Sequence, residues 1–405
     1  MKKTILLYIL IIYSVNLAAQ DDYIPLNVNR NNAFSLEYFS TVRSNTENCA
    51  VSPFGISCAM AMLYIGGEGN TQKVIAEKMN FITPFGVLFG YKQLLKKYQI
   101  YRTNDINLLF GNALWIGSKA EIQKKYKNLL KVNFNAHVQE INFKDEKEAA
   151  AKLMNRWVKK SSNFNLLSIV RPEDIKNIDE LVYSNYMFLD GAWENPFNEQ
   201  LTQKEDFFLK DGTRKKVDFM NQTSYLKYNE NDIFQILELP YSGNNISMIL
   251  ILPKNDTYLD SVERSLNLVN YDFWTGELYT KLVNLSLPKF KIEQTQIFSK
   301  VEATGNFELA FSNKSDYSNI SKEPIQFSRM IQKTIIQVVE NKNNSNIETF
   351  GSPDNKNKGK ENTFIDFKAN RPFIFVISDN QNNCILMVGK VNIPGVNNLS
   401  AEYYK

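Results

Sequence analysis

Long apolar runs with the composition of β-strands are the feature that most restricts how this chain folds. Residues 106–116 and 181–189 are mostly apolar and have the length of single long strands. Residues 233–239 and 246–252 flank Ser242-Gly243-Asn244, a turn sequence that predicts a β-hairpin. These runs favour large sheets as the framework of the fold.

Helical signals fill much of the first half of the chain. Ser52 and Pro53 predict a helix start, since Ser caps an N-terminus well and Pro suits the first turn; Gly66-Gly67 predicts its end. Asn70-Thr71 is expected to cap a second helix over residues 72–79. Apolar residues recur with helical periodicity in three further segments, namely residues 87–98, 121–132 and 147–160.

Strands dominate the second half. Residues 283–292 alternate between apolar and polar, and residues 373–378 and 384–391 predict a terminal hairpin. Interwoven helices and strands of this kind indicate an α+β fold with large antiparallel sheets. The sequence contains no internal repeat and no Pro/Gly-rich linker, so we expect residues 20–405 to form a single domain.

Composition is that of a globular protein with no strong charge preference. The 405 residues are 43% hydrophobic and 22% charged, with a net charge of +4. This balance gives no reason to expect a nucleic-acid or membrane partner.

The N-terminus has the pattern of a secretory signal peptide. A short basic start, Met1-Lys2-Lys3, precedes a mostly apolar run over residues 5–15, and Ala18-Ala19 offers small residues for cleavage. The apolar run is too short to span a bilayer. We therefore expect residues 1–19 to be removed and the mature chain to be secreted into the extracellular space.

Export gives meaning to the Asn-X-Ser/Thr sequences, which mark acceptors for N-glycosylation. The pattern occurs at Asn221, Asn245, Asn255, Asn284, Asn313, Asn319, Asn343 and Asn398. Asn is abundant here, so several matches are expected by chance. The three cysteines, Cys49, Cys58 and Cys384, are too few for a disulfide scaffold and are expected to be buried thiols with at most one bridge.

Motifs for catalysis or cofactor binding are missing from the sequence. His137 is the single histidine and lies in a strand-like run, where a structural role is expected. The chain contains no G-x-S-x-G, H-E-x-x-H, P-loop or G-x-G-x-x-G sequence, and no clustered Cys/His spacing for a metal. We therefore expect no enzyme activity, no cofactor and no metal site.

Several segments together resemble the serpin family, in order and in spacing. They are VSPFGISCAMAMLYIGGEGNTQ (51–72), LVYSNYMFLDGAWENPFN (181–198), YSGNNISMILILP (241–253), VNLSLPKFKIE (283–293) and FKANRPFIFVISDNQNNCILMVGKVNIP (367–394). The resemblance implies a single domain of three β-sheets and about nine helices, with an exposed reactive loop. It also implies a monomer whose partner is a serine endopeptidase. The peptidase cleaves the loop, and the loop's N-terminal part enters the central sheet while the enzyme is still attached.

Residues 340–363 stand where the family has its reactive loop. By resemblance the hinge comprises Glu340, Asn341, Lys342, Asn343, Asn344, Ser345, Asn346 and Ile347. Lys342 and Asn343 replace the usual Gly and Thr, and polar residues replace the usual run of small ones. Asn is disfavoured in strands, and a buried amide without partners costs roughly 1–3 kcal/mol, so we expect loop insertion to be impaired.

The alternation of side chains along a strand reduces the impairment that we expect. Asn343, Ser345, Ile347 and Thr349 are expected to turn inward on insertion, and only Asn343 is clearly unsuited to the interior. Asn343 also begins a glycosylation sequence, and a glycan there would block insertion.

The scissile bond has two candidate positions. Family spacing counted forward from Glu340 places the cut after Lys356, whereas spacing counted back from Phe367 places it after Glu361. Lys356, Lys358 and Lys360 suit the acidic pocket of a trypsin-like peptidase. The alternative, that these lysines only keep a long loop soluble, is equally open.

Other positions match residues that the family uses to hold the central strands together. Ser52 and Asn185 match shutter residues below the central sheet, and Trp193 matches the residue at its top. Two positions depart from the family: Gly55 stands where a second Ser is common, and Gln332 where a His is common. The sequence thus predicts a secreted inhibitor of serine endopeptidases; the alternative is a non-inhibitory serpin acting as a binding or carrier protein.

Overall fold

The computed structural model describes nine stretches of the chain, namely residues 23–44, 46–103, 105–117, 121–143, 147–175, 181–255, 258–299, 305–340 and 364–395. The predicted signal peptide, residues 341–363 of the predicted loop, and Asn398 lie outside them. The side chains of residues 305 and 306 are also not described.

Eight α-helices lie within the described residues, where the sequence predicts about nine for the whole chain. They are α2 (Tyr23–Val42), α3 (Pro53–Gly66), α4 (Gly69–Met79), α5 (Pro84–Ile100), α6 (Lys124–Phe134), α7 (Lys147–Ser161), α8 (Leu259–Ser265) and α9 (Leu268–Gly276). Three short 3-10 helices accompany them, η1 (Pro172–Ile175), η2 (Glu199–Leu201) and η4 (Gly305–Phe311).

The strands lie mostly in the second half of the chain, as predicted. They are β1 (Cys49–Val51), β2 (Ile106–Gly117), β3 (His137–Ile141), β4 (Leu181–Gly191), β5 (Gln203–Phe208), β6 (Arg214–Glu230), β7 (Phe234–Pro240), β8 (Ile246–Pro253), β9 (Tyr279–Pro288), β10 (Phe290–Ser299), β11 (Phe327–Val338), β12 (Ile365–Lys368), β13 (Phe373–Asp379) and β14 (Ile385–Val391).

Hydrogen bonding joins these strands into two sheets. The central sheet has five strands in the order β10-β11-β4-β2-β3. The other has nine, in the order β1-β14-β13-β8-β7-β6-β9-β12 with β5 paired to β6. β6 pairs with β7 only through its last residues, 227–230, and with β9 over residues 219–228. The described strands therefore form two hydrogen-bonded sheets where the resemblance predicts three, because β6 pairs with both β7 and β9 and so joins two arrays into one sheet.

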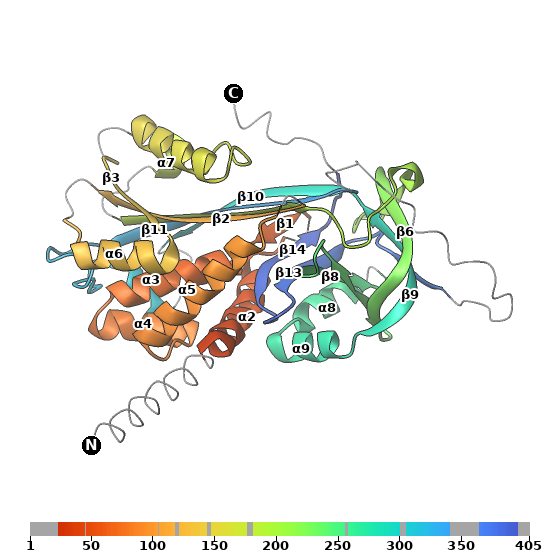
Figure 1. Ribbon diagram of the computed structural model, residues 1–405, viewed down its shortest axis with the longest axis horizontal. Coiled ribbons are helices and arrows are strands. Elements are labelled where there is room, and N and C mark those ends of the chain that lie inside the picture. Colours follow the sequence, from red (N-terminus) through yellow and green to blue (C-terminus); the bar gives the residue numbers. More distant parts are fainter. Residues whose placement is uncertain are drawn as a thin grey trace, which may run out of the picture.

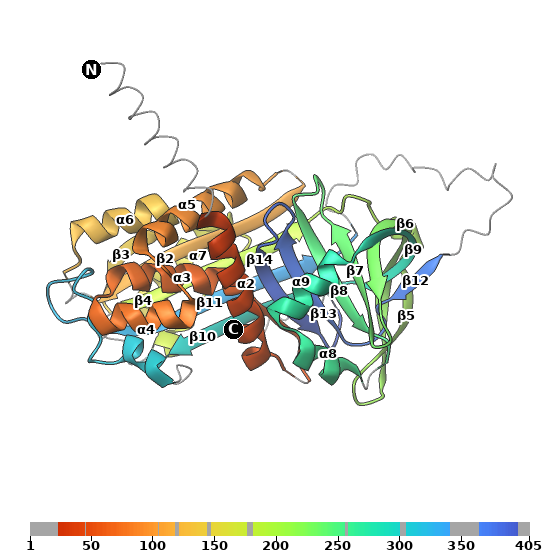
Figure 2. The ribbon, with the colours of Figure 1, turned by 90° about the horizontal axis from the view of Figure 1, so that it is seen from below.

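Helices cover both faces of the central sheet. Figure 1 shows α7 lying across one face and α3 to α6 packed below the other. Figure 2, seen from below, shows those helices at one end of the molecule and β5, β6, β9 and β12 at the opposite end. The main core lies between the helices and the inner faces of the sheets, and a second core joins α7 to the central sheet.

Local sequence signals are mostly confirmed. The Ser52 side chain caps α3 by accepting a hydrogen bond from the Gly55 backbone N–H, and the helix ends at Gly66. The predicted cap at Asn70-Thr71 is wrong: α4 begins at Gly69 with Glu68 as N-cap, because the Thr71 hydroxyl instead accepts from the Asp316 N–H at 2.7 Å. The single strand predicted over residues 283–292 is also wrong, since Lys289 separates β9 from β10.

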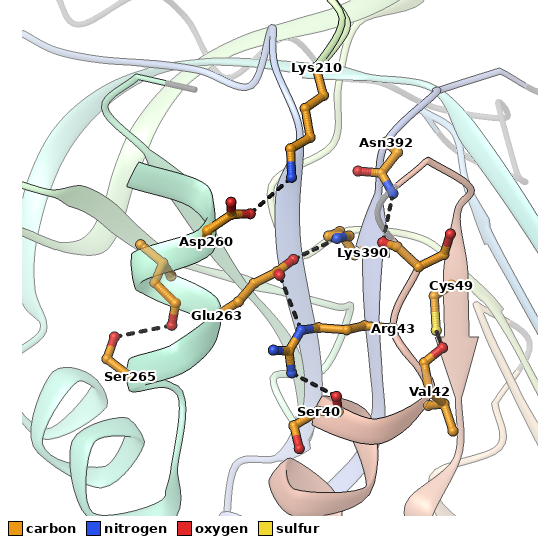
Figure 3. A network of polar contacts seen from close by, with 12 residues as sticks. Ser40, Val42, Arg43, Cys49, Lys210, Asp260, Glu263, Ser265, Lys390 and Asn392 are labelled. Atoms are coloured by element: carbon orange, nitrogen blue, oxygen red, sulfur yellow. Dashed lines mark hydrogen bonds and ion pairs between the residues drawn. The ribbon is translucent and has the colours of Figure 1, made fainter. Parts of the chain in front are cut away.

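A buried charge cluster joins α2, α8 and β14. Lys390 of β14 is fully buried, and its Nζ lies 2.6 Å from Glu263 Oε1 on α8. Arg43, just after α2, places its Nε 3.1 Å from the other oxygen of Glu263 (Figure 3). One turn earlier on α8, Asp260 forms a more exposed pair with Lys210 at 2.9 Å. The Glu263 carboxylate thus ties three elements that are distant in sequence.

The three cysteines are buried free thiols, which confirms the expectation of at most one bridge. Burial raises the pKa of both Cys49 and Cys384 to about 12, and that of Cys58 well above its usual value. Thiols held in the neutral form are poor nucleophiles, so these residues are structural.

Candidate functional site

The two ends of the predicted loop are attached to different sheets. Glu340 follows β11 of the central sheet, and Phe364 precedes β12 at the edge of the nine-stranded sheet. Figure 2 places β12 beside β9, at the end of the molecule opposite the helices α3 to α6. The segment predicted to be cleaved therefore connects two separate sheets.

β11 lies in the central sheet between β4 and β10. It pairs with β10 antiparallel and with β4 in parallel, the latter over residues 327–336 of β11 and 181–189 of β4. β4 and β11 are thus direct hydrogen-bonded neighbours along most of their length.

A buried amide cluster holds β11 and β4 to the start of α3. The Gln332 side chain on β11 accepts a hydrogen bond from the Ser52 N–H at 2.9 Å and donates to the Ser52 carbonyl oxygen at 2.7 Å. Its Nε2 also donates to Asn185 Oδ1 on β4 at 2.9 Å. The Ser52 hydroxyl donates to the Leu386 carbonyl oxygen at 2.9 Å, which links β14 to the same cluster.

Gly55 lies directly against this cluster. A Cβ atom at Gly55 would be 2.6 Å from Asn185 Oδ1 and 2.9 Å from Gln332 Nε2, closer than real contacts of a Cβ atom. Gly55 and Gln332, each a departure from the family at the sequence level, are therefore complementary. The long amide occupies space that only a glycine leaves free.

The same register aligns four amide residues across the central sheet. Gln296, Gln332, Asn185 and Asn112 are successive partners on β10, β11, β4 and β2. The Nδ2 of Asn185, which is fully buried, has no hydrogen-bond partner among the described residues. An unpaired buried donor of this kind is costly and is a position where a further acceptor would be stabilised.

Trp193 lies beyond the top of the cluster, where β11 ends. Its indole Nε1–H donates to the Val339 carbonyl oxygen at 2.9 Å. Its ring stacks on Tyr241 with centroids 4.4 Å apart and meets Phe197 edge-on at 6.1 Å. Trp193 therefore fixes Val339, the residue after β11, to the nine-stranded sheet.

Glu340 is the one predicted hinge residue within the described chain, and it is anchored. Glu340 is 4% exposed, and its Oε1 lies 2.5 Å from Lys289 Nζ and accepts from the Thr202 hydroxyl at 2.6 Å. Burial acts to raise the pKa of this carboxyl, but the hydrogen bonds from Lys289 and Thr202 bring the pKa below its usual value. Glu340 is thus ionised at neutral pH and fixes the point where the loop begins.

The remaining hinge residues and all candidate reactive bonds lie outside the described residues. These are Asn341, Lys342, Asn343, Asn344, Ser345, Asn346 and Ile347, together with Lys356, Lys358, Lys360 and Glu361. Their roles stay predictions.

The glycosylation candidates within the described residues all reach the surface. Asn255, Asn284, Asn313 and Asn319 are exposed, and Asn221 and Asn245 are partly exposed. Asn343 and Asn398 lie outside the described chain. Surface positions are compatible with glycans, and the predictions stand as made.

His137 has the surroundings of a structural residue. Its Nε2 lies 2.8 Å from Gln139 Oε1, and its ring packs between Trp115 and Trp157 with centroid distances of 5.4 and 6.3 Å. Within the nine described stretches there is also no group of three His, Cys, Asp or Glu side chains arranged to hold a metal ion.

None of the helices in the described part of the chain has both the length and the apolar character needed to cross a membrane.

Comparison with known proteins agrees with this geometry. The sequence profile of a family described as Serpin (serine protease inhibitor) matches residues 29–394. The chain belongs to the serpin family. It is 30% identical to an uncharacterised serpin-like protein of Methanosarcina mazei, covering 91% of this chain and 87% of the relative. It is 27% identical to Serpin B6 of Macaca fascicularis, covering 90% and 98%.

The structural similarity is equally extensive. A crystal structure of native protease nexin-1 with heparin superposes with a TM-score of 0.80 at 26% identity, covering 92% of this chain and 100% of the other. Serpins are usually inhibitors of proteases rather than enzymes. The α+β serpin fold expected from the sequence is thereby confirmed.

Sequence reasoning missed three features of the site. It treated Gly55 and Gln332 as two separate losses, although they fit one another. It gave no sign that Lys289 and Thr202 anchor Glu340, or that Asn185 has an unpaired amide. The positions of these residues on strands were readable, but their pairing depends on a register between strands far apart in the chain.

Proposed function

We propose that this serpin is an exported inhibitor of serine endopeptidases of the trypsin type. The peptidase cleaves within residues 341–363, and the N-terminal part of the loop then inserts between β4 and β11 while the enzyme is still attached. The supporting observation is that β4 and β11 are direct parallel neighbours at the strand from which the loop begins.

The direction in which the loop would run favours its insertion between β4 and β11. A segment that turns back after Glu340 runs antiparallel to β11, and so antiparallel to β4 as well. Its insertion replaces one parallel ladder by two antiparallel ladders, and antiparallel pairing is slightly more stable per residue. The five-stranded sheet is then a metastable state that insertion relaxes.

The register of insertion identifies the difficult step. In a hairpin with a two-residue turn at Glu340-Asn341, Asn343 lies opposite Val338 and Ser345 opposite Ile336. Val338 and Ile336 are fully buried in the main core, so the Asn343 amide enters an apolar environment. Burial of an unpaired amide costs roughly 1–3 kcal/mol, which on the insertion barrier slows the step about tenfold or more. Trapping is therefore impaired relative to cleavage.

Further along the inserted strand, burial of a polar side chain is more favourable. Thr349 lies opposite Gln332 and on the same face, at the level of Asn185. The Thr349 hydroxyl is an acceptor that suits the unpaired Nδ2 of Asn185. The four aligned amide residues of the central sheet thus offer hydrogen-bond partners to a polar inserted strand, which apolar residues at the same positions would not.

A direct test is incubation with a panel of serine endopeptidases that includes trypsin, followed by denaturing electrophoresis. Trapping produces a complex that survives SDS, together with a fraction of cleaved free serpin. Cleavage in the loop without any SDS-stable complex across the panel would count against inhibition. Asn343→Thr is expected to raise the trapped fraction.

The same loop supports a second candidate, a non-inhibitory serpin that binds or carries a partner. The polar hinge from Lys342 to Asn346 is the observation in its favour. A cleaved protein that inserts promptly on heating would exclude it.

Export rests on the N-terminal sequence. Mass spectrometry of the secreted protein is expected to find a mature N-terminus at Gln20 and glycans on some of the predicted asparagines. An intracellular protein that retains residues 1–19 would contradict export.

A further inference from the structure

The strands β6, β9 and β12 carry an apolar row on their outward face. The face is defined by a polar ladder: the Thr223 hydroxyl donates to Asn284 Oδ1 at 3.5 Å, and Asn284 Nδ2 donates to Asp366 Oδ1 at 2.9 Å. Side chains two positions along a strand share a face. Tyr225 and its cross-strand partner Leu282 therefore lie on this face. Phe364, two positions before Asp366, continues the row towards β12.

The outward apolar row, Tyr225, Leu282 and Phe364, is exposed. Tyr225 is 68% exposed and Phe364 53%, and Leu282 is partly exposed. The opposite face of the same strands is core, with Val283 and Leu285 fully buried. These outward side chains therefore do not hold the sheet to the core.

Polar groups border the outward apolar row on both sides. The ladder of Thr223, Asn284 and Asp366 lies along one side. On the other, Lys227 and Thr280 are cross-strand partners, and the exposed Lys227 forms an ion pair with the largely buried Glu238 at 2.9 Å. An aromatic centre with a polar rim is the arrangement found in protein–protein contacts, where Tyr is frequent among the residues that contribute most.

The position of the outward apolar row identifies its partner. Phe364 directly follows residues 341–363, so the chain that a peptidase would grip ends at the row. The candidate cuts after Lys356 and Glu361 are eight and three residues before Phe364. A fully extended chain spans at most about 3.6 Å per residue, so a peptidase holding either bond lies within about 30 Å of Phe364. Its surface beside the substrate cleft must come close to these strands.

We propose that the outward apolar row is a docking surface for the serine endopeptidase that cleaves the loop. This inference rests on the proposed function, because it assumes that the loop is a peptidase substrate. The partner chemistry is an apolar or aromatic segment at the rim of a trypsin-type active site. Because the loop tethers the two proteins, the second contact forms at a high effective concentration and adds affinity without any change in the cleaved sequence.

The experiment uses the full-length serpin with trypsin as the probe. Steady-state cleavage of the loop is measured for the wild type, for Tyr225→Ala and for Phe273→Ala. Phe273 is a matched control, since it is 65% exposed and lies on α9, which is not part of the strands that carry the row. Both changes are at exposed side chains, and unchanged melting temperatures check that both variants fold.

Tyr225→Ala is expected to raise KM about three- to tenfold with little change in kcat. The reason is that the lost contact stabilises the bound substrate and the transition state equally. Phe273→Ala is expected to leave both constants unchanged. A peptide of residues 341–363 lacks the row, and its KM is expected to exceed that of the wild-type serpin but not that of Tyr225→Ala. If trypsin is trapped, the second-order rate constant for complex formation replaces kcat/KM and falls by the same factor.

Equal constants for Tyr225→Ala and the wild type would overturn the proposal. So would a wild-type dimer in solution that Tyr225→Ala dissociates, because the row would then be covered by a second copy of the chain. These results are separate from the proposed function. Loss of SDS-stable complexes alone argues against trapping, whereas docking is read from the KM of cleavage.

Discussion

Substitution of Gly55 by Ser tests whether the amide cluster is built around the glycine. A Cβ at this position would approach Asn185 Oδ1 to 2.6 Å and Gln332 Nε2 to 2.9 Å. Those two atoms are hydrogen-bonded to each other at 2.9 Å. The new side chain cannot enter without displacing one of them, and Gln332 is also held by two bonds to the Ser52 backbone.

The magnitude follows from these contacts. Overpacking of a tight interior costs about 1–3 kcal/mol, and loss of one buried hydrogen bond adds about 1 kcal/mol. We expect Gly55→Ser to lower the free energy of unfolding by about 2–4 kcal/mol. For a chain of this size, an unfolding entropy of about 2.1 cal/mol/K per residue converts that loss into a fall in Tm of about 2–5 °C.

Thermal unfolding followed by circular dichroism measures the effect, and a double-mutant cycle assigns its cause. Gln332→Ala alone strips the Ser52 N–H and carbonyl of their partner and is expected to cost about 3–5 kcal/mol. The double variant should be less destabilised than the sum by at least about 1 kcal/mol, because the serine then has room. Gly276→Ser is the matched control, since no atom lies within 4 Å of its Cβ position. A Gly55→Ser protein that melts like the control, or strictly additive effects, would refute the reasoning.

Two further predictions concern buried charges. Glu263→Gln leaves the fully buried Lys390 without its counter-charge and should cost about 3–5 kcal/mol, whereas Asp260→Asn, in the exposed pair on the same helix, should cost less than about 1 kcal/mol; equal melting temperatures for the two variants would contradict this. Folding lowers the pKa of Glu340 from its usual 4.5, so the ionised carboxylate stabilises the folded state. This stabilisation is fully present above pH about 4.5 and is lost as the pH falls through the lower pKa of the folded state. Glu340→Gln should therefore lower stability at pH 7 by about 1.5–3 kcal/mol and narrow its difference from the wild type at pH 3, and a difference independent of pH would exclude this role.

Much of the fold is readable from local sequence signals. Ser52-Pro53 and Gly66-Gly67 act within one helix, and the capping bond from the Gly55 N–H to the Ser52 hydroxyl is made over three residues. The errors arose where a distant segment competes with a local signal. Thr71 has the composition of a cap, yet its hydroxyl serves the backbone of Asp316, which no local pattern reveals.

The location of the site could be predicted from the sequence, but the contacts between its residues could not. Resemblance placed Ser52, Asn185 and Gln332 in one region, and the structure brings them within hydrogen-bond distance. The fit between Gly55 and Gln332 depends on atoms of two residues that are 277 positions apart in the sequence. The charge cluster is similar: Lys390 and Glu263 are ordinary charged residues in the sequence, and their burial as an ion pair appears only once the fold brings α8 and β14 together.

The central claim is that the loop after Glu340 can become a strand between β4 and β11. Melting of the intact and the loop-cleaved serpin side by side tests it most directly, with cleavage by trypsin confirmed by mass spectrometry. Insertion predicts that the cleaved protein melts far above the intact one, because a new antiparallel strand joins both neighbours. A cleaved protein with the same Tm as the intact one, even after heating to promote insertion, would contradict the account.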